Sequence, residues 1–94
     1  MDRFQVILTE HAIADLKEIP KELREQIHLD LRALESTPFS SGTTIKRLKG
    51  FRPPVYRLRT SDFRVLYHIQ RDAITLLRII YRKLLERIIK RLRR

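Results

Sequence analysis

Arginines in the second half of the chain are spaced in a way that suits phosphate binding. Arg57 and Arg59 are two residues apart, and Arg64 and His68 are four residues apart. Alternate side chains of a strand point to the same face, so each pair would share one face of a sheet. A guanidinium donates two hydrogen bonds to a phosphate and stays charged at any accessible pH. If the strands are neighbours, these four residues and Arg78 line a concave basic surface that attracts phosphate.

The charge of the chain is concentrated in the same half. The formal net charge is +10, yet residues 1–42 carry five basic against eight acidic side chains, and residues 43–94 carry sixteen basic against three acidic. Such a one-sided field raises the local concentration of a polyanion and speeds encounter with it. Nucleic acid is the polyanion that we expect. A solvated basic surface without a partner and an anionic membrane surface are the alternatives.

Length and composition limit the other classes. A chain of 94 residues builds one compact core, so we expect a single domain over residues 1–94. The chain has no cysteine, which excludes disulfides and thiolate chemistry and favours a reducing, cytoplasmic setting. No stretch approaches the roughly 20 apolar residues that span a bilayer. We therefore expect neither secretion nor a membrane span.

The N-terminal half predicts elements that would support the basic strands. Residues 4–8 form a β-branched and aromatic run typical of a strand. Thr9 can cap a helix whose apolar residues follow helical spacing as far as Ile19. Pro20 suits the first turn of a second helix, whose apolar stripe ends at Leu34. These two helices would form a hairpin.

A turn-rich segment, residues 36–42, separates the helices from three strand-like runs at residues 55–59, 63–70 and 73–80. The connections between the runs are short and polar, so consecutive strands should pair as antiparallel hairpins. The expected fold is a two-layer α+β domain, with the N-terminal strand and helical hairpin packed on a twisted, mainly antiparallel sheet. The other face of the sheet would be free for function. The residues expected to face the core from the second run are Phe63, Val65, Tyr67 and Ile69.

The stretch from Arg82 onward has apolar residues at helical spacing among basic ones, which predicts a C-terminal amphipathic helix. Its stripe could pack on the protein's own sheet or bind a partner, and the pattern does not decide between them. The residues of the stripe are Leu84, Leu85, Ile88, Ile89 and Leu92.

The order of these motifs resembles that of the RelE-like toxins, a group within the RelE/ParE superfamily of bacterial and archaeal toxin–antitoxin pairs. The likeness extends over nearly the whole chain. It rests on IKRLKG at residues 45–50, VYRLR at residues 55–59 and DFRVLY at residues 62–67, which follow the family's pattern in sequence and spacing. The last of these motifs is the most specific.

This resemblance implies a ribosome-dependent endoribonuclease that cuts messenger RNA and inhibits translation. The reaction would need no metal or other cofactor, because the adjacent 2′-hydroxyl attacks phosphorus and leaves a 2′,3′-cyclic phosphate. By motif, Arg64 and Arg82 are expected at the scissile phosphate, and Arg57 and Arg59 on the messenger or ribosomal backbone. Further RNA-binding residues are expected at Lys46, Arg47, Lys49 and Arg78.

The chain departs from the family where proton transfer is usually placed. Many relatives carry a tyrosine a few residues after the second arginine, but no tyrosine follows Tyr81 here. Histidine is a common proton-transfer residue, which points to His68, and Glu86 lies one helical turn beyond Arg82. These two residues are the candidates for proton transfer.

The resemblance also implies a RelB-like antitoxin as partner, bound through the C-terminal stripe defined above, with acidic segments that suit the basic half. Two other functions remain open. One is a non-enzymatic ParE-like toxin directed at DNA gyrase, against which the pair Arg64 and Arg82 argues. The other is a catalytically weak RNA-binding relative, which the missing tyrosine favours.

Overall fold

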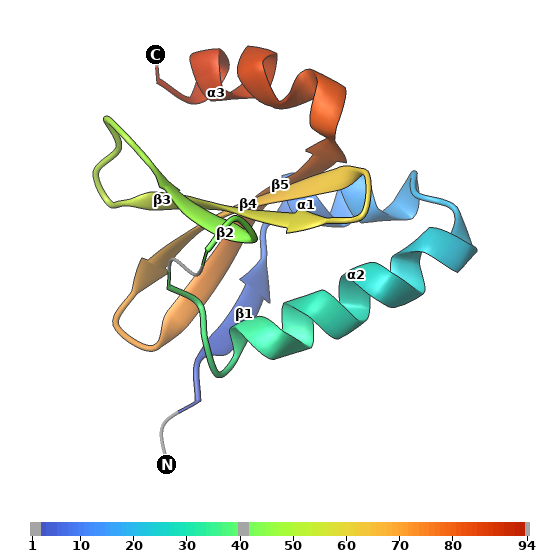
Figure 1. Ribbon diagram of the computed structural model, residues 1–94, viewed down its shortest axis with the longest axis horizontal. Helices are drawn as coiled ribbons and strands as arrows, with labels where there is room; N and C mark the ends of the chain where they lie inside the picture. Colours follow the sequence, from blue (N-terminus) through green and yellow to red (C-terminus); the bar gives the residue numbers. More distant parts are fainter. Residues whose placement is uncertain (1–2, 40–41, 94) are drawn as a thin grey trace.

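A computed structural model describes residues 3–39 and 42–93. Strand β1 (Gln5–Leu8) leads into helices α1 (Glu10–Lys17) and α2 (Lys21–Leu34). Strands β2 (Ile45–Leu48), β3 (Val55–Thr60), β4 (Phe63–Gln70) and β5 (Ala73–Tyr81) follow, and then the 3-10 helix η1 (Arg82–Leu84) and helix α3 (Leu85–Leu92) (Figure 1). Across the described residues, no helix is both long and apolar enough to cross a membrane.

The five strands form one sheet in the order β1-β5-β4-β3-β2. Strand β1 runs parallel to β5, and the other neighbours pair antiparallel. This confirms the expected α+β fold. Strand β2 was not expected, because its sequence IKRL places two charged residues side by side in place of an alternating pattern. Of the turn-rich segment 36–42, residues 40 and 41 lie outside the described residues.

The start of α1 is tied to the sheet through Thr9. Its Oγ1 accepts a hydrogen bond from the Ala12 backbone N–H at 3.2 Å, which is the N-cap that the sequence predicts. The same hydroxyl donates to the Leu76 carbonyl of β5 at 2.8 Å. Thr9 therefore links the first turn of α1 to β5.

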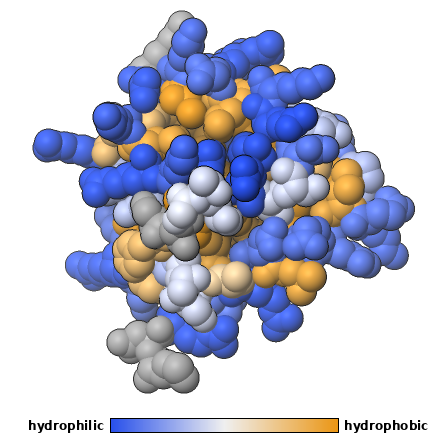
Figure 2. All heavy atoms as spheres, viewed as in Figure 1, coloured by the Kyte–Doolittle hydropathy of each residue, from blue (hydrophilic) through white to orange (hydrophobic). Residues whose placement is uncertain are grey.

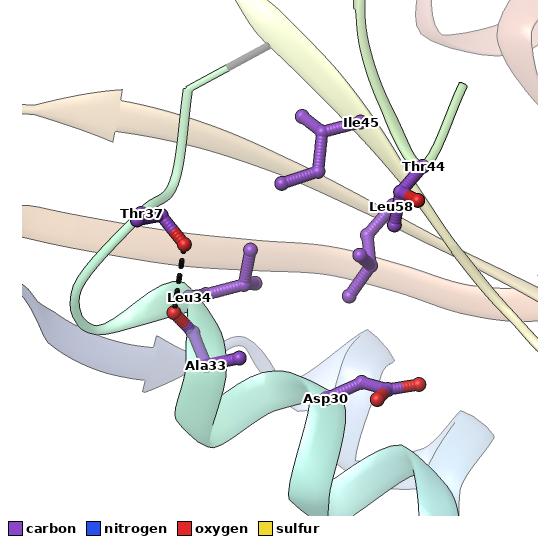
Figure 3. Close-up of a pocket in the computed structure, with 7 residues that line it drawn as sticks. All are labelled: Asp30, Ala33, Leu34, Thr37, Thr44, Ile45 and Leu58. Atoms are coloured by element: carbon purple, nitrogen blue, oxygen red, sulfur yellow. Dashed lines mark hydrogen bonds between the residues drawn. The ribbon is translucent and has the colours of Figure 1, made fainter. Parts of the chain in front are cut away.

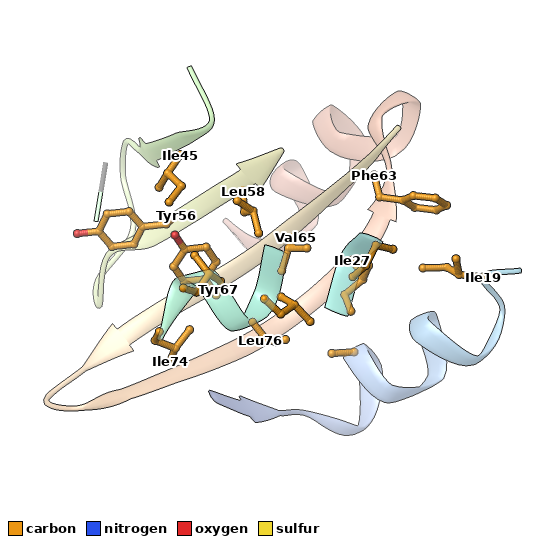
Figure 4. Close-up of a cluster of buried hydrophobic side chains, with 14 residues drawn as sticks. Ile19, Ile27, Ile45, Tyr56, Leu58, Phe63, Val65, Tyr67, Ile74 and Leu76 are labelled. Carbon is orange, nitrogen blue, oxygen red and sulfur yellow. The ribbon is translucent and has the colours of Figure 1, made fainter. Parts of the chain in front are cut away.

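Helices α1 and α2 cover one face of the sheet, and the main core lies between them and the strands (Figure 4). Phe63, Val65 and Tyr67 of β4 are at most 3% exposed, and Ile69 is partly buried beside them. This confirms the face that alternation predicts. The Tyr67 hydroxyl donates to the Pro38 carbonyl at 2.7 Å, so this buried polar group is satisfied.

The pairing of β4 with β5 contains a bulge. Leu66 pairs with Arg78 and Tyr67 pairs with Leu76, which leaves Leu77 as an extra residue on β5. The simple alternation of faces along β5 is interrupted at this point. Counting every second residue from the start of β5 therefore assigns the residues beyond the bulge to the wrong face.

Helix α3 packs on the second face of the sheet, which corrects the expectation that this face is free (Figure 1). Ile88 is 6% exposed. It packs in one cluster with Val55, Leu66 and Ile80, which come from three different strands. A helix of eight residues is not stable alone in water, so this burial must hold it in place.

Candidate nucleic-acid interface

The strand register brings four basic side chains to the face of the sheet that α3 also uses. Lys46 of β2 lies opposite Arg57 of β3, and Arg59 lies opposite Arg64 of β4. Partners across a pair of strands share a face, and so do alternate residues of one strand. Helix α3 covers the apolar part of this face, so the basic side chains form the part beside it. Like charges placed directly opposite each other destabilise a sheet, and an anion bound between them would relieve this repulsion.

Arg82 joins this group from the end of β5. Its backbone N–H donates to the Asp62 carbonyl at 2.9 Å, which ties the start of η1 to the β3–β4 turn. The Arg82 Nε atom is 4.0 Å from Asp62 Oδ1, with both side chains more than 60% exposed, so this ion pair is weak. Asp62 was not expected in the site, although it opens the DFRVLY motif. Arg57, Arg59, Arg64 and Arg82 are called the arginine cluster below.

The arginines of the cluster repel one another, and burial together with this repulsion lowers the pKa values of two of them. Burial lowers the pKa of the Arg64 guanidinium most, and the positive charges of the other three arginines lower it further. Asp62 acts in the opposite direction. Burial also lowers the pKa of Arg57, with Arg59 adding to the effect. The guanidiniums nevertheless stay protonated at any accessible pH, so the cluster holds uncompensated positive charge.

Backbone carbonyls and a hydroxyl, not carboxylates, hold three of these guanidiniums. Arg57 Nη2 donates to the Thr43 carbonyl at 2.6 Å, and Arg59 Nη2 lies 3.5 Å from Thr43 Oγ1. Arg64 Nη1 donates to the carbonyls of Ser61 and of Phe63, at 3.1 Å and 2.8 Å. The Nε atom of Arg57 is buried and has no partner. The side chains are therefore oriented while donors and charge stay available for a phosphate.

The three basic residues expected around β2 differ in position. Lys46 is exposed beside Arg57, on the face of the arginine cluster. Arg47 lies opposite Tyr56, whose ring belongs to the core under the helices, so Arg47 points to the other face. The carbonyl of Lys49 accepts a hydrogen bond from Arg93 Nη2 at 3.1 Å, near the end of α3. Of the three, Lys46 is the residue that strand pairing places beside the arginine cluster.

Arg78 is not part of the arginine cluster, which corrects the expectation for this residue. Its Nε and Nη2 atoms donate to the two carboxylate oxygens of Asp15 at 2.7 Å and 3.0 Å. The hydrogen bond to Asp15 raises the pKa of Arg78. Strand β1 ends opposite Leu76, so the edge of β5 beyond it is open, and Asp15 of α1 also accepts the Ile79 backbone N–H there at 2.9 Å. Arg78 therefore secures α1 to the sheet.

His68 is on the same face as Arg64 but does not meet it. The two residues are four positions apart on β4, which is roughly 13 Å at about 3.3 Å per residue. Leu66 lies between them on this face and is fully buried in the cluster under α3. The Nδ1 atom of His68 is buried without a hydrogen-bond partner. The structure does not bring His68 into the arginine cluster.

Glu86 is exposed in the first turn of α3, and its carboxylate forms no ion pair within residues 3–39 and 42–93. Its carboxylate is therefore not neutralised by Arg82, Lys83 or Lys90 within these residues. The apolar stripe of the C-terminal segment faces the sheet: Leu84, Leu85 and Leu92 are partly buried around Ile88. Ile89 is only half-buried and lies outside this cluster.

A cavity of about 220 Å³ lies between α2 and strands β2 and β3 (Figure 3). Leu34, Ile45 and Leu58 form its apolar wall. Its one carboxylate, Asp30, accepts a hydrogen bond from Gln26 Nε2 at 3.0 Å. No arginine lines the cavity, and its apolar wall belongs to the core under the helices. It is therefore separate from the arginine cluster.

Hydrophilic side chains cover most of the surface seen in Figure 2, and apolar atoms show between them near α3. The exposed basic residues of α3 are Arg87, Lys90 and Arg91. They add positive charge to the side of the sheet on which α3 packs. This arrangement suits a long polyanion better than a small ligand.

Comparison with known proteins gives the family. The sequence model of the family described as "ParE toxin of type II toxin-antitoxin system, parDE" matches residues 6–93. No curated protein matches the sequence significantly. The fold is similar to that of solved toxin structures at identities below 25%.

Three such structures illustrate the likeness. One is the archaeal RelE–RelB complex from Pyrococcus horikoshii OT3, with 23% identity and a TM-score of 0.72 over 84% of this chain and 94% of that chain. Another is the toxin–antitoxin complex RelBE2 from Mycobacterium tuberculosis, with 22% identity and a TM-score of 0.71 over 85% of this chain and 99% of that chain. The third is the YoeB dimer from Staphylococcus aureus, with 19% identity and a TM-score of 0.68 over 84% of this chain and 97% of that chain. Because the family model spans nearly the whole chain, the protein belongs to this family of ParE toxins of type II toxin–antitoxin systems, and its fold is similar to that of the RelE and YoeB structures.

Proposed function

We propose that this toxin is a ribosome-dependent endoribonuclease that cleaves messenger RNA and so inhibits translation in the cytoplasm. The observation that carries the proposal is the arginine cluster. Four guanidiniums converge at one end of the sheet, and the carboxylate of Asp62 acts on two of them, Arg64 and Arg82. Such a group is suited to a phosphate on which negative charge develops during reaction.

The proposed reaction is attack of a ribose 2′-oxygen on the adjacent phosphorus. The bond from phosphorus to the 5′-oxygen breaks, the 2′-hydroxyl loses its proton, and the leaving oxygen takes one up. The products are a 2′,3′-cyclic phosphate and a 5′-hydroxyl. Arg64 and Arg82 would stabilise the charge on the phosphate oxygens, while Arg57 and Arg59 would bind the flanking backbone.

Glu86 and His68 are the two candidates for proton transfer. Glu86 is the better of the two candidates, because α3 follows η1 directly and Glu86 is one helical turn from Arg82. His68 is disfavoured by its separation from Arg64 along β4. General acid–base catalysis contributes roughly 10²- to 10⁴-fold in enzymes that use it. Glu86→Gln should lower the cleavage rate within this range if Glu86 transfers the proton.

The proposed partner is a RelB-like antitoxin. Two of the similar structures are the RelE–RelB and RelBE2 toxin–antitoxin complexes described above. Acidic segments of such a partner would match the basic half of this chain. The C-terminal stripe centred on Ile88 would become available to it only if α3 moves, because Ile88 is buried against the sheet.

Induction of the toxin in a bacterial host tests the nuclease proposal. Growth arrest and primer-extension mapping of messenger ends would be measured for the natural chain, Arg64→Ala and Arg82→Ala. We expect cuts inside translated codons that fall by about 10²- to 10³-fold in either variant, which is typical for loss of one charge-stabilising donor. Arg32→Ala is the matched control, because Arg32 is exposed on α2, whose helix covers the other face of the sheet.

A ParE-like toxin directed at DNA gyrase is the second candidate, and the family model that matches residues 6–93 favours it. Growth arrest without messenger cuts, together with inhibition of gyrase supercoiling by purified toxin, would support this candidate and refute the nuclease. Binding of RNA without any cleavage, and with no effect on gyrase, would instead identify a catalytically weak RNA-binding relative.

A further inference from the structure

A second cavity lies at the end of the sheet where β5 passes into η1. Its volume is about 360 Å³. Pockets that hold small organic groups typically measure about 300–1,000 Å³. Glu18, Ile19 and Pro20 form one wall at the C-terminal end of α1, and Phe63 and Tyr81 form the facing wall. Figure 4 shows the Phe63 ring directed toward Ile19 from the start of β4.

The aromatic wall of this cavity, formed by Phe63 and Tyr81, consists of one buried ring and one half-exposed ring. The rings of Phe63 and Tyr81 stack with centroids 4.6 Å apart and planes inclined by 29°. Phe63 is 3% exposed and is therefore fixed in the core, whereas Tyr81 is 50% exposed. A half-exposed ring supported by a buried one provides a flat apolar surface. Proteins use such surfaces to stack unpaired nucleobases.

The two residues of the aromatic wall are adjacent in sequence to residues of the arginine cluster. Phe63 precedes Arg64, and Tyr81 precedes Arg82. Phe63 pairs with Tyr81 across the two strands, and both rings lie on the α1 side of the sheet. Arg64 lies on the opposite side, at the same strand ends. A nucleotide whose phosphate contacts the arginines can therefore place its base around the end of the sheet against Tyr81.

The rim of the cavity carries one carboxylate that is available to a ligand. Both oxygens of Asp15 are occupied by Arg78 and by the Ile79 backbone N–H. The exposed carboxylate of Glu18 makes no ion pair or side-chain hydrogen bond within the described part of the chain. A carboxylate accepts hydrogen bonds from an exocyclic amino group. Adenine, cytosine and guanine carry such a group, and uracil does not.

We infer that this cavity binds one base of the RNA substrate, stacked on Tyr81, and that Glu18 selects a base with an amino group. This inference rests on the proposed function for its substrate class. It adds a base-recognition site to a phosphate site that contacts only the backbone. The base held there would bias which nucleotide of a codon lies next to the cut.

NMR titration of the ¹⁵N-labelled natural chain tests the inference without ribosomes. The probes are the four ribonucleoside 3′-monophosphates at millimolar concentration, with ribose 5-phosphate as a probe that has no base. We expect the amides of Phe63, Tyr81 and Leu84 to shift with nucleotides and not with ribose 5-phosphate. Uridine 3′-monophosphate should bind about tenfold more weakly than the others, which is the size of effect expected for one lost hydrogen bond to a charged group.

Three variants separate stacking from structural effects. Tyr81→Ala should abolish the shifts specific to the base while keeping those at Arg64 and Arg82, and Tyr81→Phe should retain both. Glu18→Ala, which removes the acceptor, should remove the difference between uridine and the other nucleotides. Base-specific shifts that persist in Tyr81→Ala, equal shifts with ribose 5-phosphate, or no shifts at all would overturn the inference.

The binding experiment tests the base site, and the cleavage experiment tests the nuclease, so one proposal can be refuted while the other stands. Base-specific shifts in a toxin that never cuts messenger RNA would refute the nuclease and leave the base site standing. Messenger cuts without base-specific shifts would leave the nuclease standing and refute the base site. In the cleavage experiment, Tyr81→Ala should also change the distribution of cut positions, which a general loss of stability would not do.

Discussion

The two faces of the sheet are filled in opposite ways, and β4 contributes to both. On the helix side, Val65 and Tyr67 have no exposed surface and pack beneath α1 and α2. On the other side, Arg64 and His68 are partly exposed, and only Leu66 between them is buried under α3. Burial of apolar side chains stabilises the first face, whereas facing arginines oppose the folding of the second. The contrast leads us to propose that the first face mainly maintains the fold and that the basic part of the second face binds.

The largest expected effect on stability comes from a substitution in the core under α1 and α2. Leu76→Ala removes a fully buried side chain from the core between β5 and the helices, which should cost about 3 kcal/mol of unfolding free energy. Urea denaturation followed by circular dichroism measures the change. A cost below about 1 kcal/mol would show that this face does not dominate stability.

A smaller effect tests the apolar part of the second face. Ile88→Ala should cost about 2 kcal/mol and release α3, because Ile88 is its one fully buried contact. Hydrogen exchange should then accelerate in α3 and leave the strands protected. Ile89→Ala is the matched control, since Ile89 lies outside this cluster. Equal acceleration in both variants would contradict the docking described here.

The buried tyrosine of the helix face gives a pH dependence. Burial raises the pKa of the Tyr67 hydroxyl, and Tyr56 adds to the shift. An unfolded tyrosine titrates near pH 10, so above about pH 10 the unfolded chain loses a proton that the folded chain keeps. Stability therefore falls with rising pH, by up to about 1.4 kcal/mol per unit. Tyr67→Phe should show a correspondingly shallower decline in urea denaturation between pH 9 and 11, and identical slopes would contradict this account.

The smallest effect on stability is expected on the basic side of the sheet, and it tests most directly whether the two faces have different roles. Arg59→Ala should change the unfolding free energy by no more than about 0.5 kcal/mol, because it removes an exposed charge that faces Arg64. It should nevertheless weaken binding to a single-stranded RNA oligonucleotide and reduce the salt dependence of that binding by about 0.7 in log–log slope. Arg32→Ala should leave both binding measurements unchanged. A large loss of stability in Arg59→Ala would show that the basic side also maintains the fold.

Local patterns predicted much of this arrangement. Alternation along residues 63–70 identified the core side of β4 and placed Arg64 on the other side. The N-cap at Thr9 was also predictable, because it depends on a hydroxyl acting on a backbone N–H three residues away. Strand β2 was missed because a four-residue edge strand with adjacent charges carries too little pattern.

Contacts between distant segments were not predictable in the same way. Asp15 and Arg78 are 63 residues apart in sequence, and no periodicity links them. The pair forms because β1 ends before β5 does and leaves an open edge that α1 can reach. The cavity beside Tyr81 is of the same kind, since its walls come from α1, β4, β5 and η1.

The sequence by itself determined the type of each long element, the core side of β4 and the basic character of the second half, because these depend on residue type and on periods of two or 3.6 residues. Only the tertiary structure decided which arginines converge, that Arg78 pairs with Asp15, and that α3 packs on its own sheet. Those outcomes depend on strand register, on a bulge and on the lengths of neighbouring strands. Each of these is settled by packing between segments that are far apart in the chain.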